Sequence, residues 1–359
     1  MPDRDRARTQ VTEPPGLGPA SWEGDVVAVG RHGLKVTRIC LGTATFGDRT
    51  PEHAANEILD LAYDAGVRFV DTSNSYPPKP GLLGEAERIL GRWMASRRRR
   101  DDLTIATKVN YPVGPGPNGR GLSRKHLFDA VDASLRRLGV EYIDLYQAHQ
   151  FDDTCPVEET LDAFDRLVQN GKVRYVGVCN WPAWRVVEAL WTAERRRFVA
   201  PISVQVRYNL LRRDAEVETL PMAARLGVGV LAYNPLAAGL LTGRYRLGEQ
   251  APPGSRFGDT GLSSRGVSMG ESYRRRYWTA GHFDAVERYR RFCSERGYDM
   301  ATTAVAWVMH QPNVTSVLIG ASEPAQLPPL LRAAQVRLSK DDLAVLDDLW
   351  WQLPRHREE

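Results

Sequence analysis

Four polar side chains in three short segments of the chain have the types needed for acid–base chemistry. VRFVDTSNSY carries Asp71 and Tyr76, LTIATKV carries Lys108, and YIDLYQAHQ carries His149. A free phenol has a pKa of about 10 and is a poor proton donor at neutral pH. If the side chains meet, Lys108 lowers the pKa of Tyr76, while Asp71 keeps Lys108 charged. His149 then orients the oxygen that receives the proton.

The three segments share one pattern, an apolar run followed directly by polar residues. This pattern is typical of a buried strand and the loop after it. In a parallel barrel, catalytic side chains lie at the carboxyl ends of the strands. Taken singly, an Asp after a strand usually caps a helix, and a lone Tyr or His usually has a structural role. Their joint occurrence after the second, third and fourth predicted strands favours one shared site.

Apolar, β-branched runs alternate with amphipathic helical patterns along the chain. Strands are predicted over residues 37–41, 67–70, 103–107, 142–148, 175–178, 202–206, 228–232 and 316–319. Helices are predicted over residues 52–65, 84–96, 125–138, 157–170, 184–196, 214–225, 302–310 and 324–333. The repeated strand–helix alternation predicts an α/β fold, a (β/α)8 TIM barrel that closes and so exposes no sheet edge. Ser123 is predicted to cap the third helix, and glycines 66, 139, 171 and 227 to end their helices.

Three further features are expected around this barrel. An N-terminal β-hairpin is predicted over residues 25–36, with its turn at residues 31–33. A long loop over residues 235–281 follows the seventh strand, before the next long helix, and is expected to lie over a ligand. An extra C-terminal helix is predicted over residues 338–353, with Leu343, Leu346 and Trp350 on one face. Residues 1–22 are predicted to be a disordered tail and residues 23–359 a single domain.

The charge distribution argues against a nucleic-acid-binding protein. The formal net charge is only +4, from 48 basic and 44 acidic residues. Arginine runs at residues 97–100, 195–197 and 274–276 contain no interleaved aromatic residues. These runs are therefore predicted to be solvated surface.

The cysteines and the apolar runs indicate the compartment. The four cysteines have no paired spacing, so neither a metal site nor a disulfide framework is expected, and a reducing compartment is favoured. No apolar run reaches the roughly 18 residues of a membrane span, and the first twenty residues lack the apolar segment of a signal peptide. A cytoplasmic protein with no membrane partner is expected. The sequence does not indicate its oligomeric state.

Longer motifs around the candidate site resemble the aldo-keto reductase family. The resemblance begins with LGT at residues 41–43 and passes through the three segments above to GKVRYVGVCN at residues 171–180. It continues with QVRYN at 205–209, YNPLAAGLLTG at 233–243 and IGAS at 319–322, and so covers most of the chain. YPP at 76–78 resembles the second loop of a bacterial branch that is also similar to potassium-channel beta subunits. Together the motifs are highly specific, although each alone is weak.

The resemblance implies a nicotinamide cofactor at the barrel mouth, commonly NADPH, with NADH as the alternative. It implies that Asn180 and Gln205 hydrogen-bond the carboxamide and that Tyr233 stacks on the nicotinamide ring. The other implied cofactor positions are Thr43, then Pro235, Leu236, Gly239 and Arg244 at the pyrophosphate, Arg256 over the adenosine phosphates, and Gly320, Ser322 and Gln326 at the adenosine. The last three lie beside a predicted helix N-terminus, which suits an anion. No GxGxxG motif follows a predicted strand, so a Rossmann fold finds no support.

Three departures from the family pattern concern the cofactor. Cys179 stands where the family usually has Ser, and a thiol is a weaker hydrogen-bonding group. Pro329 and Leu330 stand where an acidic residue and an Asn commonly hold the adenine. Asn234 replaces the usual Ser after the stacking tyrosine, with little expected effect. None of these changes affects the four candidate catalytic residues.

The resemblance implies an NADPH-dependent reductase that delivers hydride to the carbonyl carbon of an aldehyde or ketone while Tyr76 protonates the oxygen. No metal is needed in this scheme. The substrate is not readable from the sequence; a keto-sugar, a secondary-metabolite ketone and a simple aldehyde all remain open. Candidate pocket residues are the aromatic side chains near strand ends, Phe46, Tyr111, Phe151 and Trp181, each of which could equally be a core residue. The alternative function is a nicotinamide-binding regulatory or scaffold subunit with vestigial catalysis.

Overall fold

The computed structural model describes residues 26–353, apart from residues 260, 263–265 and 267. Eight parallel strands form a closed barrel in the order β10-β3-β4-β5-β6-β7-β8-β9. They are β3 (Ile39–Gly42), β4 (Phe69–Asp71), β5 (Thr104–Val109), β6 (Ile143–Ala148), β7 (Val173–Cys179), β8 (Ser203–Arg207), β9 (Gly229–Tyr233) and β10 (Val314–Ile319). The predicted (β/α)8 TIM barrel is therefore confirmed, and each predicted strand overlaps an observed one.

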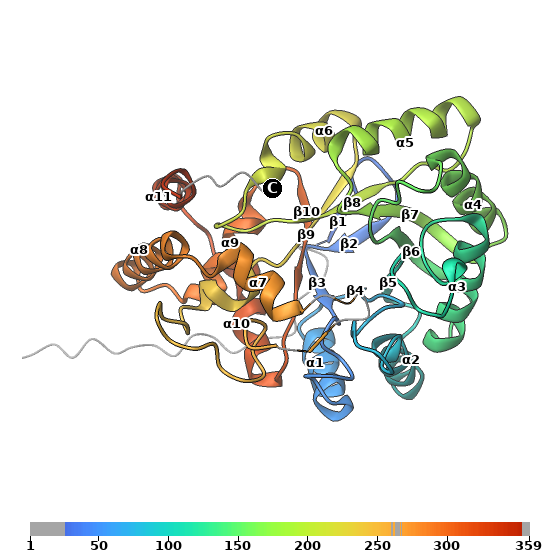
Figure 1. Cartoon of the computed structure of the whole chain (residues 1–359). Helices are drawn as coiled ribbons and strands as arrows, with labels where there is room; N and C mark the ends of the chain where they lie inside the picture. Colours follow the sequence, from blue (N-terminus) through green and yellow to red (C-terminus); the bar gives the residue numbers. More distant parts are fainter. Residues whose placement is uncertain (1–25, 260, 263–265, 267, 354–359) are drawn as a thin grey trace, which may run out of the picture.

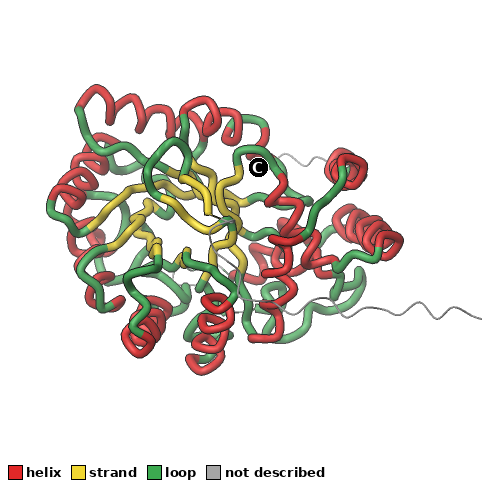
Figure 2. Tube along the Cα trace, turned by 180° about the vertical axis from the view of Figure 1, so that it is seen from behind, coloured by secondary structure: helices red, strands yellow, loops and turns green. Residues whose placement is uncertain are grey.

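Helices surround this barrel (Figures 1 and 2). They are α1 (Glu52–Asp64), α2 (Glu85–Arg97), α3 (Arg124–Leu138), α4 (Val157–Gln169), α5 (Ala183–Arg196), α6 (Thr219–Leu226), α7 (Met269–Tyr277), α8 (Ala280–Arg296), α9 (Met300–His310), α10 (Leu327–Leu331) and α11 (Lys340–Trp351). Local signals set several of their ends. The Ser123 side chain accepts a hydrogen bond from the backbone N–H of His126 and begins α3, and Gly139 ends it in the left-handed conformation.

The N-terminal hairpin fills the end of the barrel opposite the candidate site. Strands β1 (Val26–Ala28) and β2 (Lys35–Thr37) pair antiparallel, as predicted. Val29 and Val36 are buried in a core cluster with side chains from inside the barrel. The backbone N–H of Arg31 donates to the carbonyl of Gly227 at 2.9 Å, which fastens the hairpin to the segment before β9. Because this end is closed, ligands have access to the carboxyl ends of the strands.

The segment after β9 differs from the single long loop that was predicted over residues 235–281. It contains a short 3-10 helix, η4 (Ala237–Thr242), and the helix α7, and α8 begins at Ala280. The Ser268 side chain caps α7 by accepting from the backbone N–H of Glu271. The α7 sequence MGESYRRRY is short and polar apart from Met269, Tyr273 and Tyr277, which lie four residues apart, so hydrophobic periodicity indicates a helix there only weakly.

Two predicted helices are interrupted where prolines or polar residues break the hydrogen-bond ladder. The predicted helix 324–333 becomes η5 (Pro324–Gln326), α10 and η6 (Arg332–Gln335), with two prolines inside α10. The predicted helix 214–225 divides into η3 (Asp214–Glu216) and α6. A further 3-10 turn, η2 (Pro117–Gly119), lies in the loop after β5.

The C-terminal helix α11 packs against α8, outside the helices that lie next to the barrel. Ser339 and Asp342 form a capping box at its start, and Leu346 and Leu349 are buried. The predicted tail over residues 1–22 lies outside the described residues, so the domain limits stay a prediction. No helix in the described part of the chain is long and apolar enough to cross a membrane.

Candidate active site

Asp71 is the centre of a polar network inside the barrel mouth. It is the last residue of β4 and is only 2% exposed. Its Oδ2 forms an ion pair with the ammonium of Lys108. Its Oδ1 accepts hydrogen bonds from Gln147 Nε2 at 3.1 Å and from Gln205 Nε2 at 2.9 Å. Strands β4, β5, β6 and β8 thus each contribute one side chain to the same buried charge network.

Lys108 is held as a buried cation by this network. Its side chain is fully buried, and Nζ also donates to the Thr72 carbonyl at 2.9 Å. Burial alone lowers the pKa of Lys108, but the carboxylate of Asp71 and the phenol of Tyr76 more than offset this effect and raise it above its ordinary value. The ammonium therefore persists at neutral pH, 5.0 Å from the centroid of the Tyr76 ring.

Tyr76 and His149 lie together beside this cation. The Tyr76 hydroxyl is 3.4 Å from His149 Nε2, and the two rings meet edge to face at 5.5 Å. The other ring nitrogen, Nδ1, is 3.1 Å from Ser73 Oγ. The backbone N–H of His149 donates to the Val109 carbonyl at 2.8 Å, which holds the end of β6 against the end of β5. The four residues singled out from the sequence therefore lie at one place, with a phenol between an ammonium and an imidazole.

Asn180 connects this group to Tyr233 across the mouth. Asn180 follows β7 in the left-handed conformation, with a φ of 59°. Its Nδ2 donates to the His149 carbonyl at 3.1 Å, and its Oδ1 accepts from the Tyr233 hydroxyl at 2.7 Å. Thr43, at the end of the first barrel strand, donates its hydroxyl to the Asp71 carbonyl at 3.2 Å. Amide and aromatic groups are thus concentrated next to the Tyr76 hydroxyl.

Cys179 joins the same network in place of the serine that the family pattern carries. Its thiol lies 3.6 Å from Gln205 Oε1 and 3.2 Å from Asn180 Nδ2. Burial raises the pKa of Cys179 to about 12, although the charge of Lys108 partly opposes this effect. The thiol therefore stays protonated and donates to Gln205.

The loop after β9 is ordered by Asn234, whose expected effect from the sequence was small. Its Oδ1 accepts from the backbone N–H of Ala238 at 2.7 Å, and its Nδ2 donates to the Tyr277 hydroxyl at 3.1 Å. Asn234 thereby connects η4 to α7. Pro235, Leu236 and Gly239 lie in this ordered turn, and Gly239 needs its glycine because its φ is 97°.

The other residues that the family resemblance assigns to the cofactor follow η4 or β10. The exposed Arg244 donates to the Tyr245 hydroxyl, and Arg256 Nη1 donates to the Tyr273 hydroxyl at 3.1 Å. At the end of β10, Gln326 Oε1 accepts from the backbone N–H of Ser322 at 3.0 Å, and Gly320 is exposed.

The two departures at the adenine position are explained by their packing. Leu330 is 3% exposed in the core, and the Pro329 carbonyl accepts from the Thr302 hydroxyl at 2.8 Å. Neither offers a polar side chain to a ligand.

Of the four aromatic pocket candidates, Tyr111 lies directly against the Tyr76–His149 pair, and Phe151 packs on Trp181. The Tyr111 ring contacts the His149 ring at 4.6 Å, and the Phe151 and Trp181 rings meet edge to face at 5.2 Å. Phe46 is fully buried in the hydrophobic core, and Trp181, only 3% exposed, belongs to the same core cluster. The placement of Phe46 fits the alternative of a core residue that the sequence left open.

The structure adds polar residues that the sequence reading did not single out. Ser73 contacts His149, and Gln147 contacts Asp71. Arg207 lies at the end of β8, in register with Tyr233. Gln147 lies two residues before His149, and Arg207 lies two residues after Gln205. Because alternate residues of a strand point to the same face, this spacing could have indicated both residues from the sequence.

The arginine run at residues 274–276 is less exposed than predicted, since the sequence indicated a solvated surface. Arg276 is partly buried, with its guanidinium 6.0 Å from the centroid of the Tyr273 ring. Arg274 donates to the Phe257 carbonyl. The prediction of solvated surface is therefore wrong for these two arginines, because Arg274 bonds the Phe257 carbonyl and Arg276 lies beside the Tyr273 ring.

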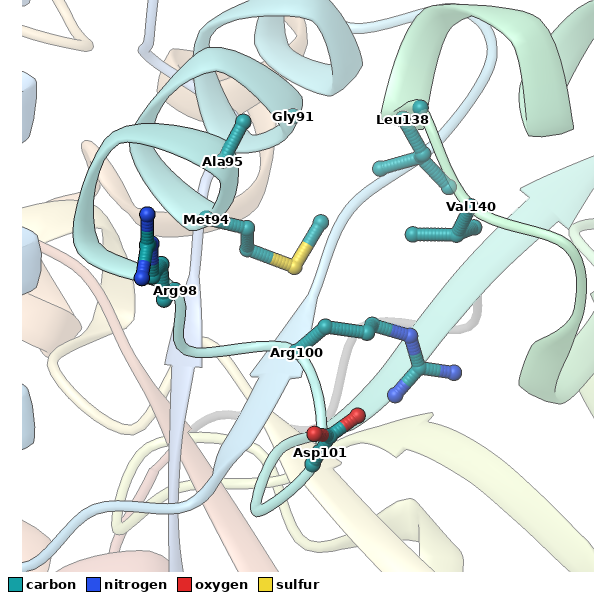
Figure 3. A pocket seen from close by; sticks show the side chains of 9 residues that line it. Gly91, Met94, Ala95, Arg98, Arg100, Asp101, Leu138 and Val140 are labelled. Atoms are coloured by element: carbon teal, nitrogen blue, oxygen red, sulfur yellow. The ribbon is translucent and has the colours of Figure 1, made fainter.

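A separate cavity of about 290 Å³ lies between α2 and α3 (Figure 3). It is lined by Met94, Leu138 and Val140, with Arg98 and Arg100 at its edge. These residues lie in the last turns of the two helices or just after them, before β5 and β6, so the cavity lies at the amino ends of the strands. It is not part of the candidate site. Among the described residues, no group of three or more His, Cys, Asp or Glu side chains is placed to hold a metal ion.

Comparison with known proteins identifies the family. The family model described as Aldo/keto reductase family matches residues 38–350. An uncharacterized oxidoreductase, YrpG, of Bacillus subtilis is 37% identical over 327 residues, which are 90% of this chain and 94% of that protein. L-glyceraldehyde 3-phosphate reductase of Escherichia coli is 36% identical, covering 89% of this chain and 90% of that protein. A probable voltage-gated potassium channel subunit beta of Arabidopsis thaliana is 35% identical, covering 86% and 90%. The chain therefore belongs to the aldo/keto reductase family and is an NAD(P)H-dependent oxidoreductase acting on carbonyl and alcohol groups.

Proposed function

We propose that this protein is an NADPH-dependent reductase of aldehydes or ketones in which Tyr76 is the general acid. The observation that carries the proposal is the position of Tyr76, whose hydroxyl is 3.4 Å from His149 Nε2 and whose ring centroid is 5.0 Å from the buried ammonium of Lys108. A phenol in this setting is the group best placed to give a proton to a substrate oxygen.

Each residue of the group has one role in the proposed reaction. A bound nicotinamide ring supplies the hydride for the carbonyl carbon, or accepts it in the reverse direction. The Tyr76 O–H bond breaks, and its proton moves to the carbonyl oxygen, which becomes the alcohol. Lys108 stabilises the negative charge left on the phenolic oxygen. His149, oriented by Ser73, holds the substrate oxygen within reach.

The polar groups at the mouth fit a nicotinamide dinucleotide. Asn180 and Gln205 are amides next to the reacting groups, and Tyr233 offers an aromatic face. Arg207 Nε is buried with no hydrogen-bond partner among the described residues, as suits a donor to an anionic ligand. The ordered turn of Pro235, Leu236 and Gly239, with Arg244, Arg256, Gly320, Ser322, Gln326 and Thr43, makes up the rest of the proposed binding site. Arg256 and Ser322 favour NADPH over NADH.

The substrate is proposed to be a small carbonyl compound that contacts an aromatic wall. In this proposal the wall consists of Tyr111, which contacts the His149 ring, and of Phe151 with Trp181, which pack on each other. A keto-sugar or a secondary-metabolite ketone suits such a surface. All four cysteines are free, and we infer a reducing, cytoplasmic location.

The test is oxidation of NADPH, with NADH in parallel, against a panel of aldehydes, ketones and keto-sugars. Tyr76→Phe is expected to lower turnover by about 10²–10⁴-fold and to leave the Kd for NADPH within about twofold, because it removes only the acid. Tyr175→Phe is the matched control, since it removes a hydroxyl from β7 that has no hydrogen bond among the described residues. Equal turnover in Tyr76→Phe and the parent would refute the proton-donor role.

The similarity to a potassium channel beta subunit supports a second candidate function, and the same assay distinguishes the two. A nicotinamide-binding subunit with vestigial catalysis would bind NADPH and oxidise it with no member of the panel. Tyr76→Phe would then change nothing measurable. The intact group of Asp71, Tyr76, Lys108 and His149 favours the reductase.

A further inference from the structure

Ser73 contacts the ring nitrogen of His149 that does not face Tyr76. Ser73 is fully buried, His149 is 7% exposed, and Ser73 Oγ lies 3.1 Å from His149 Nδ1. The other ring nitrogen, Nε2, lies 3.4 Å from the Tyr76 hydroxyl. A neutral imidazole carries one N–H proton, so one of its nitrogens donates a hydrogen bond and the other accepts one. The position of this proton therefore decides how His149 acts on Tyr76.

The two tautomers of His149 have opposite effects on the proposed acid. With the proton on Nδ1, Nε2 accepts the hydrogen bond of the Tyr76 hydroxyl, whose proton then points at the imidazole rather than at a substrate oxygen. With the proton on Nε2, His149 donates to the phenolic oxygen, and the Tyr76 proton stays free for the substrate. Only the Nε2–H tautomer therefore leaves Tyr76 ready to act as a general acid.

The contacts between Ser73 and Ser75 distinguish the two tautomers. Ser73 Oγ accepts a hydrogen bond from the backbone N–H of Ser75 at 3.2 Å, and the two hydroxyl oxygens are 3.1 Å apart. Ser75 is 2% exposed, and its hydroxyl has no other hydrogen-bond partner among the described residues. The Ser75 proton is therefore satisfied only if it is donated to Ser73 Oγ.

This arrangement leaves the Ser73 hydroxyl only one possible acceptor for its own proton. A hydroxyl has two acceptor sites and one proton, and the N–H and O–H of Ser75 occupy both acceptor sites of Ser73. The Ser73 proton therefore goes to His149 Nδ1, which must be unprotonated. In the opposite arrangement Nδ1–H donates to Ser73, Ser73 donates to Ser75, and the buried Ser75 proton has no acceptor, which destabilises that network.

We propose that Ser73 is a positioning residue that fixes His149 as the Nε2–H tautomer and so keeps the Tyr76 proton available to the substrate. Ser75 supports this role by occupying the acceptor sites of Ser73. His149 keeps its proton while the Tyr76 O–H bond breaks, and Nε2–H then donates to the phenolate that remains. The inference deepens the proposed function and rests on it for the role of Tyr76, but not for the tautomer itself.

Nitrogen-15 NMR of the histidine rings measures the tautomer without turnover. At about pH 8 an ordinary imidazole is neutral, and the chemical shifts of its two nitrogens report which of them carries the proton. The chain has 7 histidines, and the signal of His149 is the one that is missing from His149→Gln. The parent is expected to show Nε2–H alone, and Ser73→Ala a mixture of both tautomers. A proton on Nδ1 in the parent, or Nε2–H alone in Ser73→Ala, would overturn the proposal.

Single-turnover hydride transfer tests the consequence for the reaction. The rate in Ser73→Ala is expected to fall about two- to tenfold, in proportion to the fraction of Nε2–H that remains, while the Kd for NADPH stays within about twofold. Ser203→Ala is the control and should react as the parent does, because it removes a buried hydroxyl at the start of β8 that has no hydrogen-bond partner in the described part of the chain. Thermal unfolding of each variant checks that it folds.

Two results separate this proposal from the proposed function. An unchanged rate in Ser73→Ala despite a mixture of tautomers would overturn the positioning role while leaving the reductase intact. If the parent oxidises NADPH with no carbonyl compound, the proposed function fails, whereas the NMR measurement still decides whether Ser73 sets the tautomer of His149.

Discussion

Replacing Lys108 with methionine is expected to destabilise the fold by leaving the charge of Asp71 buried and unpaired. The two side chains have similar lengths, so the change removes the ammonium with little change in packing. Asp71, 2% exposed, would keep only the amide hydrogen bonds from Gln147 and Gln205. Removing one partner of a buried ion pair costs about 3–5 kcal/mol. The two remaining donors place the expected loss near the lower limit, about 3 kcal/mol.

Thermal unfolding measures this loss. With an unfolding entropy of about 2.1 cal/mol/K per residue, the 359 residues give about 0.75 kcal/mol/K, so a loss of about 3 kcal/mol should lower the Tm of Lys108→Met by about 4 °C. Adding Asp71→Asn should recover more than half of the loss, because no buried charge remains. Lys125→Met is the matched control, since Lys125 forms an exposed pair with Asp129 worth at most about 0.5 kcal/mol.

The pKa of Lys108 also predicts how its contribution to stability changes with pH. The pKa of Lys108 lies above its ordinary value of about 10.4 in the folded protein, because Asp71 and Tyr76 outweigh the effect of burial. The contribution of Lys108 to stability is therefore complete below about pH 10 and is lost as the pH rises towards the folded-state pKa. The Tm difference between parent and variant should stay constant from about pH 6 to 9. A Tm change no larger than that of Lys125→Met, or no recovery in the double variant, would refute the buried-pair reasoning.

Two other expectations concern the thiol network and the hairpin. Cys179 should resist alkylation in the native protein at about pH 8, because burial raises its pKa to about 12; mass spectrometry that finds it labelled as fast as the partly exposed Cys155 would contradict this. Gly30→Ala should lower stability by at least about 3 kcal/mol, since the new Cβ would lie 2.2 Å from the Gly227 carbonyl oxygen at a φ of +59°. Gly81→Ala is the control, because Gly81 has a φ of +79° but no atom within 4 Å of the new Cβ, so its free energy of unfolding should fall by only about 1 kcal/mol. Equal Tm shifts for the two variants would contradict the steric clash predicted at Gly30.

The order of strands and helices was readable from the sequence because the signals for a barrel are local. Each strand is a short apolar run, and each polar residue of Asp71, Lys108 and His149 lies at or next to the end of its run. Parallel pairing then requires these ends to meet at one face of the barrel. For this reason the four candidate catalytic residues could be chosen, and their mutual proximity predicted, without coordinates.

The contacts that tune the site depended on tertiary structure. Asp71 accepts from Gln205, 134 residues away, and periodicity cannot predict such a pairing. The helix α7 is short and has only three apolar residues, Met269, Tyr273 and Tyr277, so its helical signal is weak. The position of Arg276 beside the Tyr273 ring was set by packing. Local sequence therefore determined which residues can do the chemistry. Long-range packing decided which charges are buried together, because burial depends on neighbours that the chain supplies from distant strands.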